Sequence, residues 1–95
     1  MDELSFSDNA AQHRFELRDA NGSLAGHADY KRDGDALVFT HTEVAPQFEG
    51  RGVGGQLARQ ALDATRERGL KAVPKCEFIA AYIARHAQYQ NLVAS

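Results

Sequence analysis

Val44-Ala45-Pro46-Gln47-Phe48-Glu49-Gly50-Arg51-Gly52-Val53-Gly54 is the stretch that decides the fold of this 95-residue chain. Residues 36–44, which lead into it, are rich in branched and aromatic side chains and predict a strand. Beyond it, one stripe recurs at helical spacing, at Val53, Leu57, Ala61 and Thr65. The glycines between the two patterns allow a tight backbone turn. The stretch therefore predicts a strand, a turn and a helix in direct succession.

The turn has the features of an anion-binding site. Its N–H groups point inward, and the helix that follows begins with unpaired donors and the positive end of its macrodipole. Together they predict a cradle for a pyrophosphate, from which the glycines keep Cβ atoms away. The Gly-Lys-Ser/Thr ending of a P-loop is missing, as is the acidic residue that marks a dinucleotide site. A tight strand-to-helix connection that binds nothing is the alternative interpretation.

Two hairpins are predicted before the turn. Residues 13–18 alternate apolar and polar side chains, and Asn21-Gly22 is a strong hairpin signal before a second strand at 23–31. Residues 32–35 form a similar turn before the strand at 36–44. Apolar groups on both faces of this third strand predict a central strand that is covered on both sides.

The remainder of the chain predicts a crossover and a second helix. Gly69 is placed to end the first helix in the left-handed conformation. Residues 70–76 are a short strand candidate parallel to the third strand, with Pro74 marking an edge or a bulge. From Glu77 apolar residues recur every three to four positions, which predicts a helix that breaks near His86-Ala87. The order β-β-β-α-β-α predicts an α/β fold with a mixed, mostly antiparallel sheet flanked by helices.

Composition narrows the class of protein. Hydrophobic residues make up 43% and charged residues 25%, as in soluble globular proteins. We expect one domain over residues 1–95, with residues 1–10 poorly ordered. The net charge of −2 argues against nucleic acid as a partner, and no apolar run is long enough for a membrane span. One cysteine and a polar N-terminus predict a cytoplasmic protein, and the scattered histidines predict no metal.

The turn also resembles a family motif. Gln47-x-x-Gly50-x-Gly52 is similar to the Gln/Arg-x-x-Gly-x-Gly/Ala acyl-CoA motif of the GNAT superfamily. Over residues 12–93 the chain resembles the compact, single-domain N-acetyltransferases of that superfamily, which share Thr40-His41-Thr42-Glu43-Val44 and Cys76-x-Phe78. Larger members carry one or two helices between their first two strands. Asn21-Gly22 closes that gap here, so these N-terminal helices are expected to be absent and the acceptor site open.

The resemblance implies acetyl-CoA, or coenzyme A, as the cofactor. In that superfamily the backbone amides of the turn hold the pyrophosphate, here residues 48–54, and the preceding strand pairs with the pantetheine arm in the manner of an added strand. His86, on the last helix, is a further predicted contact. The implied cofactor-binding residues are Thr42, Val44, Gln47, Phe48, Glu49, Gly50, Arg51, Gly52, Val53, Gly54 and His86.

Acetyl transfer to an amine needs a base for the ammonium group, and two residues qualify. His41 and Glu43 lie two apart on one strand, so their side chains project to the same face. Either can take the proton, directly or through water. The alternatives are a hydrogen-bonded strand histidine and a solvated carboxylate. The resemblance implies that the backbone N–H of Val44 or its neighbour polarises the thioester carbonyl.

Cys76 and Tyr82 are the other catalytic candidates. Cys76 ends the fourth strand before a helix N-terminus and is a candidate nucleophile with His41 as its partner. Its alternative is a small buried hydrophobic residue, and direct transfer is the usual superfamily route. The resemblance implies Tyr82 as the acid for the CoA thiolate. Tyr82 and Tyr89 are expected on one helix face, where core packing is the alternative role for both.

These observations predict an acetyl-CoA-dependent N-acetyltransferase that acts on a primary amine of a small molecule or a protein. A CoA-binding module with little or no catalysis is the alternative. A small α/β fold that binds another nucleotide is a third hypothesis. The expected partner is acetyl-CoA, the amine acceptor is not identified by the sequence, and the expected assembly is a monomer or a weak homodimer.

Overall fold

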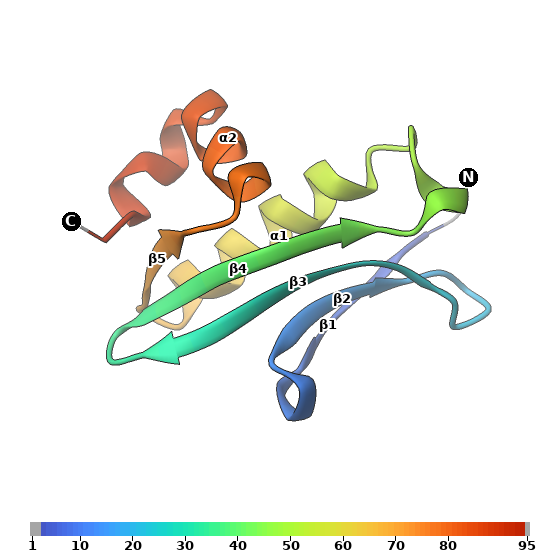
Figure 1. Ribbon diagram of the computed structural model, residues 1–95, viewed down its shortest axis with the longest axis horizontal. Helices are drawn as coiled ribbons and strands as arrows, with labels where there is room; N and C mark the ends of the chain where they lie inside the picture. The colour runs from blue at the N-terminus through green and yellow to red at the C-terminus, as the bar shows by residue number, and fades with distance from the viewer. Residues whose placement is uncertain (1–2, 95) are drawn as a thin grey trace.

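The computed structural model describes residues 3–94, which form one five-stranded sheet with two α-helices (Figure 1). The strands are β1 Ser5–Asn9, β2 Arg14–Arg18, β3 Leu24–Asp33, β4 Ala36–Val44 and β5 Lys71–Pro74. The α-helices are α1 Val53–Glu67 and α2 Glu77–Arg85. Short 3-10 segments are η1 Ala10–Gln12, η2 Pro46–Phe48 and η3 Ala87–Leu92.

The strands lie side by side in chain order, β1-β2-β3-β4-β5. The first four are antiparallel, and β5 returns through α1 to pair parallel with β4. This confirms the predicted mixed, mostly antiparallel sheet and its parallel crossover. Between β2 and β3 the Asp19 carboxylate accepts hydrogen bonds from the N–H groups of Asn21 and Ser23, both at 2.9 Å. The chain therefore turns back over residues 19–23 without a helix, as predicted.

The first strand is a correction to the sequence analysis. Residues 1–10 were expected to be poorly ordered, but Ser5–Asn9 pairs in register with β2; residues 1–2 lie outside the described part. The Phe6 ring stacks on Phe15 with 5.3 Å between ring centroids, and the Asn9 side chain accepts from the Gln12 N–H at 3.2 Å. Strand β1 is therefore held by residues that follow it in the chain. Its own short, polar sequence contains no alternating apolar pattern that would predict a strand.

The core lies on one face of the sheet, where α1 packs behind the strands in Figure 1. The buried side chains of α1 include the predicted stripe, Val53, Leu57, Ala61 with Leu62, and Thr65, and also Ala58. The Thr65 hydroxyl donates to the Ala61 carbonyl at 2.8 Å, so its burial leaves no unpaired donor. Gly69 has φ 70°, which confirms the left-handed end of the helix. Helix α2 and η3 pack beside α1 through Ile79, Ile83, Tyr89 and Leu92.

The outer face of the sheet differs from the prediction. The apolar content of β4 predicted cover on both sides, but His41 and Glu43 are 58% and 63% exposed on the outer face. Farther along this face Glu16 is 3% exposed and accepts from Asn9 Nδ2 at 3.0 Å, Arg14 Nε at 2.7 Å and Arg18 Nε at 3.2 Å. A charged network, and not a second apolar layer, therefore covers this part of the sheet.

A β-bulge in β4 redirects its side chains. Asp29 pairs with His41 and Tyr30 pairs with Phe39, so Thr40 is an extra residue on β4. Because of this insertion Thr42, and not His41, follows Phe39 on the core face: Thr42 pairs with the buried Ala28. The bulge thus decides which side chains of β4 face the helices.

The C-terminal segment confirms the predicted break near His86-Ala87. Helix α2 ends at Arg85, His86 is extended, and η3 follows. Tyr82 and Tyr89 were expected on one helix face, but they lie on different elements with their ring centroids 6.0 Å apart. The Tyr89 hydroxyl donates to Asp63 Oδ1 at 2.6 Å, which ties η3 to α1. Burial and the Asp63 carboxylate raise the pKa of Tyr89 to about 12.

Among residues 3–94, no helix combines the length and the apolar character that a membrane crossing requires.

Gly26 tests the packing of α1 against β3. A Cβ atom there would lie 3.0 Å from the Glu43 carbonyl oxygen and 3.3 Å from a Val53 methyl group, so Gly26→Ala must displace backbone or α1. We expect a loss of about 1–3 kcal/mol in the free energy of unfolding, measured by urea titration. Gly55→Ala is the matched control, because its Cβ would meet nothing within 4 Å. The control should stabilise α1 by up to about 1 kcal/mol, and equal effects of the two changes would contradict this packing.

Glu16 tests the charged network. Burial raises its pKa, but the hydrogen bonds from Asn9, Arg14 and Arg18 outweigh burial and hold the pKa below the usual glutamate value. Glu16→Gln should therefore cost about 1–2 kcal/mol at neutral pH, measured by urea titration across a pH series. Since the folded-state pKa is lowered, this difference is present above the usual glutamate range and should shrink as pH falls below it. Glu43→Gln, exposed on the same face, should change stability by less than about 0.5 kcal/mol. A pH-independent difference would contradict the assignment.

Candidate functional site

The turn after β4 has the geometry that its glycines predict. Gly50 and Gly52 have φ values of 81° and 75°, which strain any residue with a Cβ atom. The first intrahelical hydrogen bond runs from the Gln56 N–H to the Gly52 carbonyl at 3.0 Å. The N–H groups of residues 53–55 therefore have no acceptor within α1, and they carry the positive end of its macrodipole. A Cβ built on Gly50 or Gly52 would meet no atom within 4 Å, so the space before the turn is open.

Two of the predicted cofactor-binding residues anchor this turn. The side chains of Phe48 and Val53 are 6% and 2% exposed and belong to the core, so only their backbone groups can meet a ligand. Gln47, just before Phe48, is exposed, as are Glu49 and Arg51 between the two buried residues. The Arg51 guanidinium lies 5.6 Å from the centroid of the Phe48 ring. The turn is thus held at both ends by burial while its middle faces solvent.

β4 and β5 separate just before this turn, as Figure 1 shows. β5 pairs with β4 only from Ala36 to Phe39, and the Cys76 N–H donates to the Phe39 carbonyl at 2.9 Å. Residues 40–44 continue beside β3 alone. Their other edge, which includes the predicted pantetheine residues Thr42 and Val44, is unpaired by any strand within residues 3–94. An extended ligand can pair with such an edge.

Cys76 lies where the two strands separate. Its thiol donates to the Thr42 hydroxyl oxygen at 3.3 Å, and the residue is half-buried immediately before α2. His41 lies on the opposite face of β4, because Thr42 faces the core and neighbouring strand residues alternate. The predicted partnership of Cys76 with His41 is therefore wrong: the structure pairs the thiol with Thr42.

His41 and Glu43 project together from the outer face, as their spacing predicts, with 3.2 Å between His41 Nε2 and Glu43 Oε1. Sequence reasoning missed their neighbours. His27 lies with its ring centroid 6.1 Å from that of His41, and its Nδ1 is 2.9 Å from Asp29 Oδ1. Two histidine–carboxylate pairs thus lie side by side. The pairing register of β3 with β4 brings these two pairs together, and no local sequence motif predicts that register.

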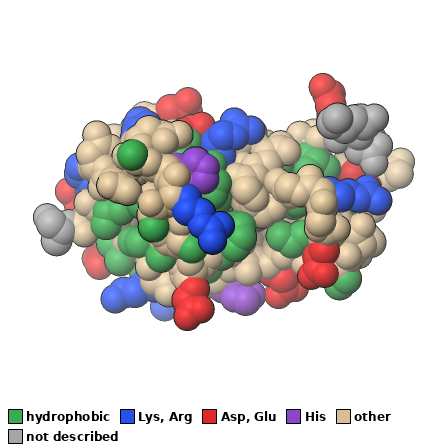
Figure 2. Space-filling view, turned by 90° about the horizontal axis from the view of Figure 1, so that it is seen from above, with side chains coloured by type: hydrophobic (Ala, Val, Ile, Leu, Met, Phe, Trp, Pro, Cys, Tyr) green, Lys and Arg blue, Asp and Glu red, His purple; other side chains and the backbone are tan. Residues whose placement is uncertain are grey.

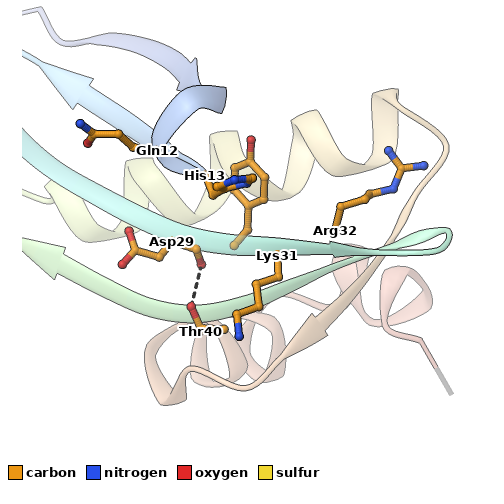
Figure 3. Close-up of a pocket in the computed structure, with 7 residues that line it drawn as sticks. Gln12, His13, Asp29, Lys31, Arg32 and Thr40 are labelled. Atoms are coloured by element: carbon orange, nitrogen blue, oxygen red, sulfur yellow. Dashed lines mark hydrogen bonds between the residues drawn. The ribbon is translucent and has the colours of Figure 1, made fainter.

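An open hollow of about 500 Å³ borders this group (Figure 3). Its lining residues are Gln12, His13, Asp29, Tyr30, Lys31, Arg32 and Thr40. Asp29 and Gln12 lie toward one end of the view, and Lys31 and Arg32 lie toward the other. The Thr40 hydroxyl reaches the Asp29 carbonyl at 3.5 Å, so the hollow adjoins the bulge of β4.

Tyr82 and His86 stack on each other at the C-terminal end of α2. Their rings stack with 3.8 Å between centroids and an interplanar angle of 14°. His86 Nδ1 lies 2.7 Å from the Tyr82 carbonyl oxygen, to which it donates, so the His86 ring is held in place. Tyr82 is half-buried against the core and next to Tyr89. Tyr82 therefore lies on the helix that Cys76 precedes and His86 directly follows that helix, and the two rings contact each other and Tyr89.

Within residues 3–94 no group of three or more His, Cys, Asp or Glu side chains is arranged to hold a metal ion.

The separating strands, the glycine turn and the helix that follows define an acetyltransferase-like fold of the GNAT type. The sequence agrees: the model of the GCN5-related N-acetyl-transferase family matches residues 14–92, and the chain belongs to this family.

Solved structures share the fold. A GCN5-like protein from Staphylococcus aureus superposes with a TM-score of 0.74 at 23% identity, covering 100% of this chain and 92% of the other. The YhbS acetyltransferase of Escherichia coli in complex with CoA gives a TM-score of 0.60 at 18% identity, over 81% of this chain and 44% of that one. Nourseothricin acetyltransferase superposes with a TM-score of 0.54 at 21% identity, covering 77% of this chain and 58% of the other. No curated protein matches the sequence.

Proposed function

We propose that this chain transfers an acetyl group from acetyl-CoA to a primary amine. One observation carries the proposal: the unpaired edge of β4 at residues 40–44 leads from the Cys76 thiol directly to the N-terminus of α1. A molecule with a pyrophosphate at one end and an extended, amide-containing arm at the other fits both parts. The family match, and a neighbour of this fold whose structure holds CoA, support that ligand.

Binding would use backbone groups for the most part. The N–H groups of residues 53–55, which have no acceptor within α1, would donate to the pyrophosphate, helped by the macrodipole of α1. The edge of β4 at Thr42 and Val44 would hydrogen-bond the amides of the pantetheine arm. The thioester would then lie near Thr42 and Cys76, where the strands separate. The reacting carbonyl would be polarised by a backbone N–H of this edge.

The transfer itself would be direct. The acceptor would approach from the open outer face, and His41 with Glu43 would take the proton from its ammonium group. The amine nitrogen attacks the thioester carbon, the C–S bond breaks, and the thiolate leaves with a proton from Tyr82 or from water. A route through acetyl-Cys76 receives less support, because the thiol contacts a hydroxyl group and not a base.

A CoA-binding module with little catalysis is the second candidate, and the exposed outer face favours it. Larger family members enclose their acceptor with helices, whereas here β2 and β3 join by a turn at residues 19–23, and His41 is 58% exposed. Assay of acetyl transfer over a broad amine panel separates the two functions. For either function we propose a single cytoplasmic domain over residues 1–95, a monomer or a weak homodimer that binds neither nucleic acid nor membranes.

Gly52 tests the CoA turn. Gly52→Glu should weaken CoA binding at least 100-fold by isothermal titration calorimetry, since a carboxylate would meet the pyrophosphate at the start of α1. Gly52→Ala is the control for backbone strain, which costs about 1–2 kcal/mol at positive φ. The control should lose less affinity at a similar melting temperature. Unchanged affinity in Gly52→Glu would remove the turn from the site.

A substitution at Cys76 distinguishes direct transfer from transfer through an acetyl-Cys76 intermediate. Under direct transfer Cys76→Ala should keep the rate within about tenfold of the wild type, because only a contact with Thr42 is lost. Intact-protein mass spectrometry after brief exposure to acetyl-CoA should show no thioester on Cys76. Loss of more than about 1000-fold in rate, together with a trapped acetyl group on Cys76, would establish the covalent route instead.

A further inference from the structure

The outer face of β3 carries a carboxylate and an ammonium group in succession. Asp29 lies opposite His41 in the pairing of β3 with β4, and Lys31 follows two residues later on the same face of β3. The Asp29 carboxylate is 37% exposed, and its Oδ1 lies 2.9 Å from His27 Nδ1. Figure 2 views the molecule from above, so this outer face forms its lower edge, where acidic, basic and histidine side chains gather. The face thus offers a carboxylate beside the predicted base and a cation farther along the strand.

The ammonium group of Lys31 is available to a ligand. Lys31 is exposed, and within residues 3–94 its side chain makes no ion pair. Figure 3 shows it on the side of β3 where Thr40 lies, at the bulge of β4. Arg32 projects to the other side of the strand, and its Nε donates to the Gly34 carbonyl at 2.6 Å, which ties it to the β3–β4 turn. Of these two cations in the hollow, Lys31 is therefore the one on the outer face.

We propose that the acceptor is a small primary amine that carries an anionic group, and that Lys31 binds this group. The proposal rests on the proposed function, in which His41 and Glu43 take the proton of the acceptor. The ammonium group of the acceptor would lie beside Asp29 and this base, and its anionic group would lie at Lys31. The two positions are two residues apart, or about 7 Å along the strand, so a spacer of a few methylene groups would join the amine to the anion.

The hollow beside β3 suits such a ligand in size and in charge. Its volume of about 500 Å³ lies within the range of small-molecule sites. A ligand with a cation at one end and an anion at the other matches Asp29 and Lys31 in sign. A lysine side chain of a protein matches less well, because the chain that continues from it carries a neutral amide where Lys31 meets an anion. Lys31 is thus a specificity-determining residue that does not touch the reacting atoms.

The chemistry of the proposed transfer is unchanged by this acceptor. One C–N bond forms and the thioester C–S bond breaks, the ammonium proton passes to His41 with Glu43, and the CoA thiolate is protonated as it leaves. The product is the N-acetylated acid, which has lost the positive charge of the amine. It therefore keeps its contact with Lys31 but no longer complements Asp29, which favours its release.

The pair ε-aminocaproate and ε-aminocaproamide tests the proposal, because the two amines have the same length and differ in the charge of one end. The amide also resembles a lysine side chain in a protein. The wild type should acetylate the carboxylate with a kcat/KM about tenfold higher than the amide, mainly through a lower KM, since the carboxylate alone makes a charge-assisted hydrogen bond to Lys31. Aminopentyl phosphate distinguishes the source of the anion: a kcat/KM above that of ε-aminocaproate would name a phosphate, and a lower value a carboxylate.

Variants of Lys31 connect the preference to this side chain. Lys31→Gln should bring the ratio of the two kcat/KM values to within about twofold of one, and Lys31→Arg, which keeps the charge, should retain most of the preference. Arg59→Gln is the matched control, because it removes the same charge from an exposed position on α1 that lines a different hollow. The control should keep the full preference.

The outcomes separate this proposal from the proposed function. Acetylation of the carboxylate, the amide and the phosphate at equal kcat/KM would overturn the proposal and leave the transferase function in place. A preference that survives in Lys31→Gln, or one that is lost equally in Arg59→Gln, would do the same. Failure of the wild type to acetylate any primary amine while it binds CoA would overturn the proposed function and this proposal with it.

Discussion

The hydrogen bond from the Cys76 N–H to the Phe39 carbonyl marks the point at which β4 loses its second neighbour. Up to this point β4 is a central strand, and beyond it residues 40–44 are held by β3 only. The unpaired backbone of that segment must be satisfied by water or by a ligand. The thiol of Cys76, the Thr42 hydroxyl and the N-terminus of α1 all owe their positions to this separation of the strands.

The turn at the end of that edge is fixed at both ends by packing against the core. Phe48 and Val53 are buried on either side of it, and Gly50 and Gly52 adopt left-handed conformations between them. The chain therefore holds the N–H groups of α1 in place before any ligand arrives, and binding need not order a loop. In the proposed function this turn would bind its ligand through backbone groups, which a chain with a small core can supply.

The two faces of the sheet are stabilised by different interactions. The inner face packs against α1, α2 and η3 and contains the apolar core. The outer face depends on paired charges, with Glu16 buried under two arginines and the His27 and His41 rings next to their carboxylates. Near His41 and Glu43 no helix of residues 3–94 covers this face, and the two side chains are 58% and 63% exposed. The outer face therefore presents exposed polar and charged side chains, including His41 and Glu43, to solvent.

The sequence by itself determined the order of the strands and α-helices from β2 onward, the tight turn after β4 and the break at His86, because glycines, hairpin dipeptides and apolar periodicity are local signals. It missed β1, whose support comes from Phe15 and other residues of later segments. Only the tertiary structure decided that Cys76 meets Thr42 and that His41 turns away, because the bulge at Thr40 sets which face each side chain takes. Side-chain partnerships across strands depend on register, and register is fixed by packing between segments that are distant in the chain.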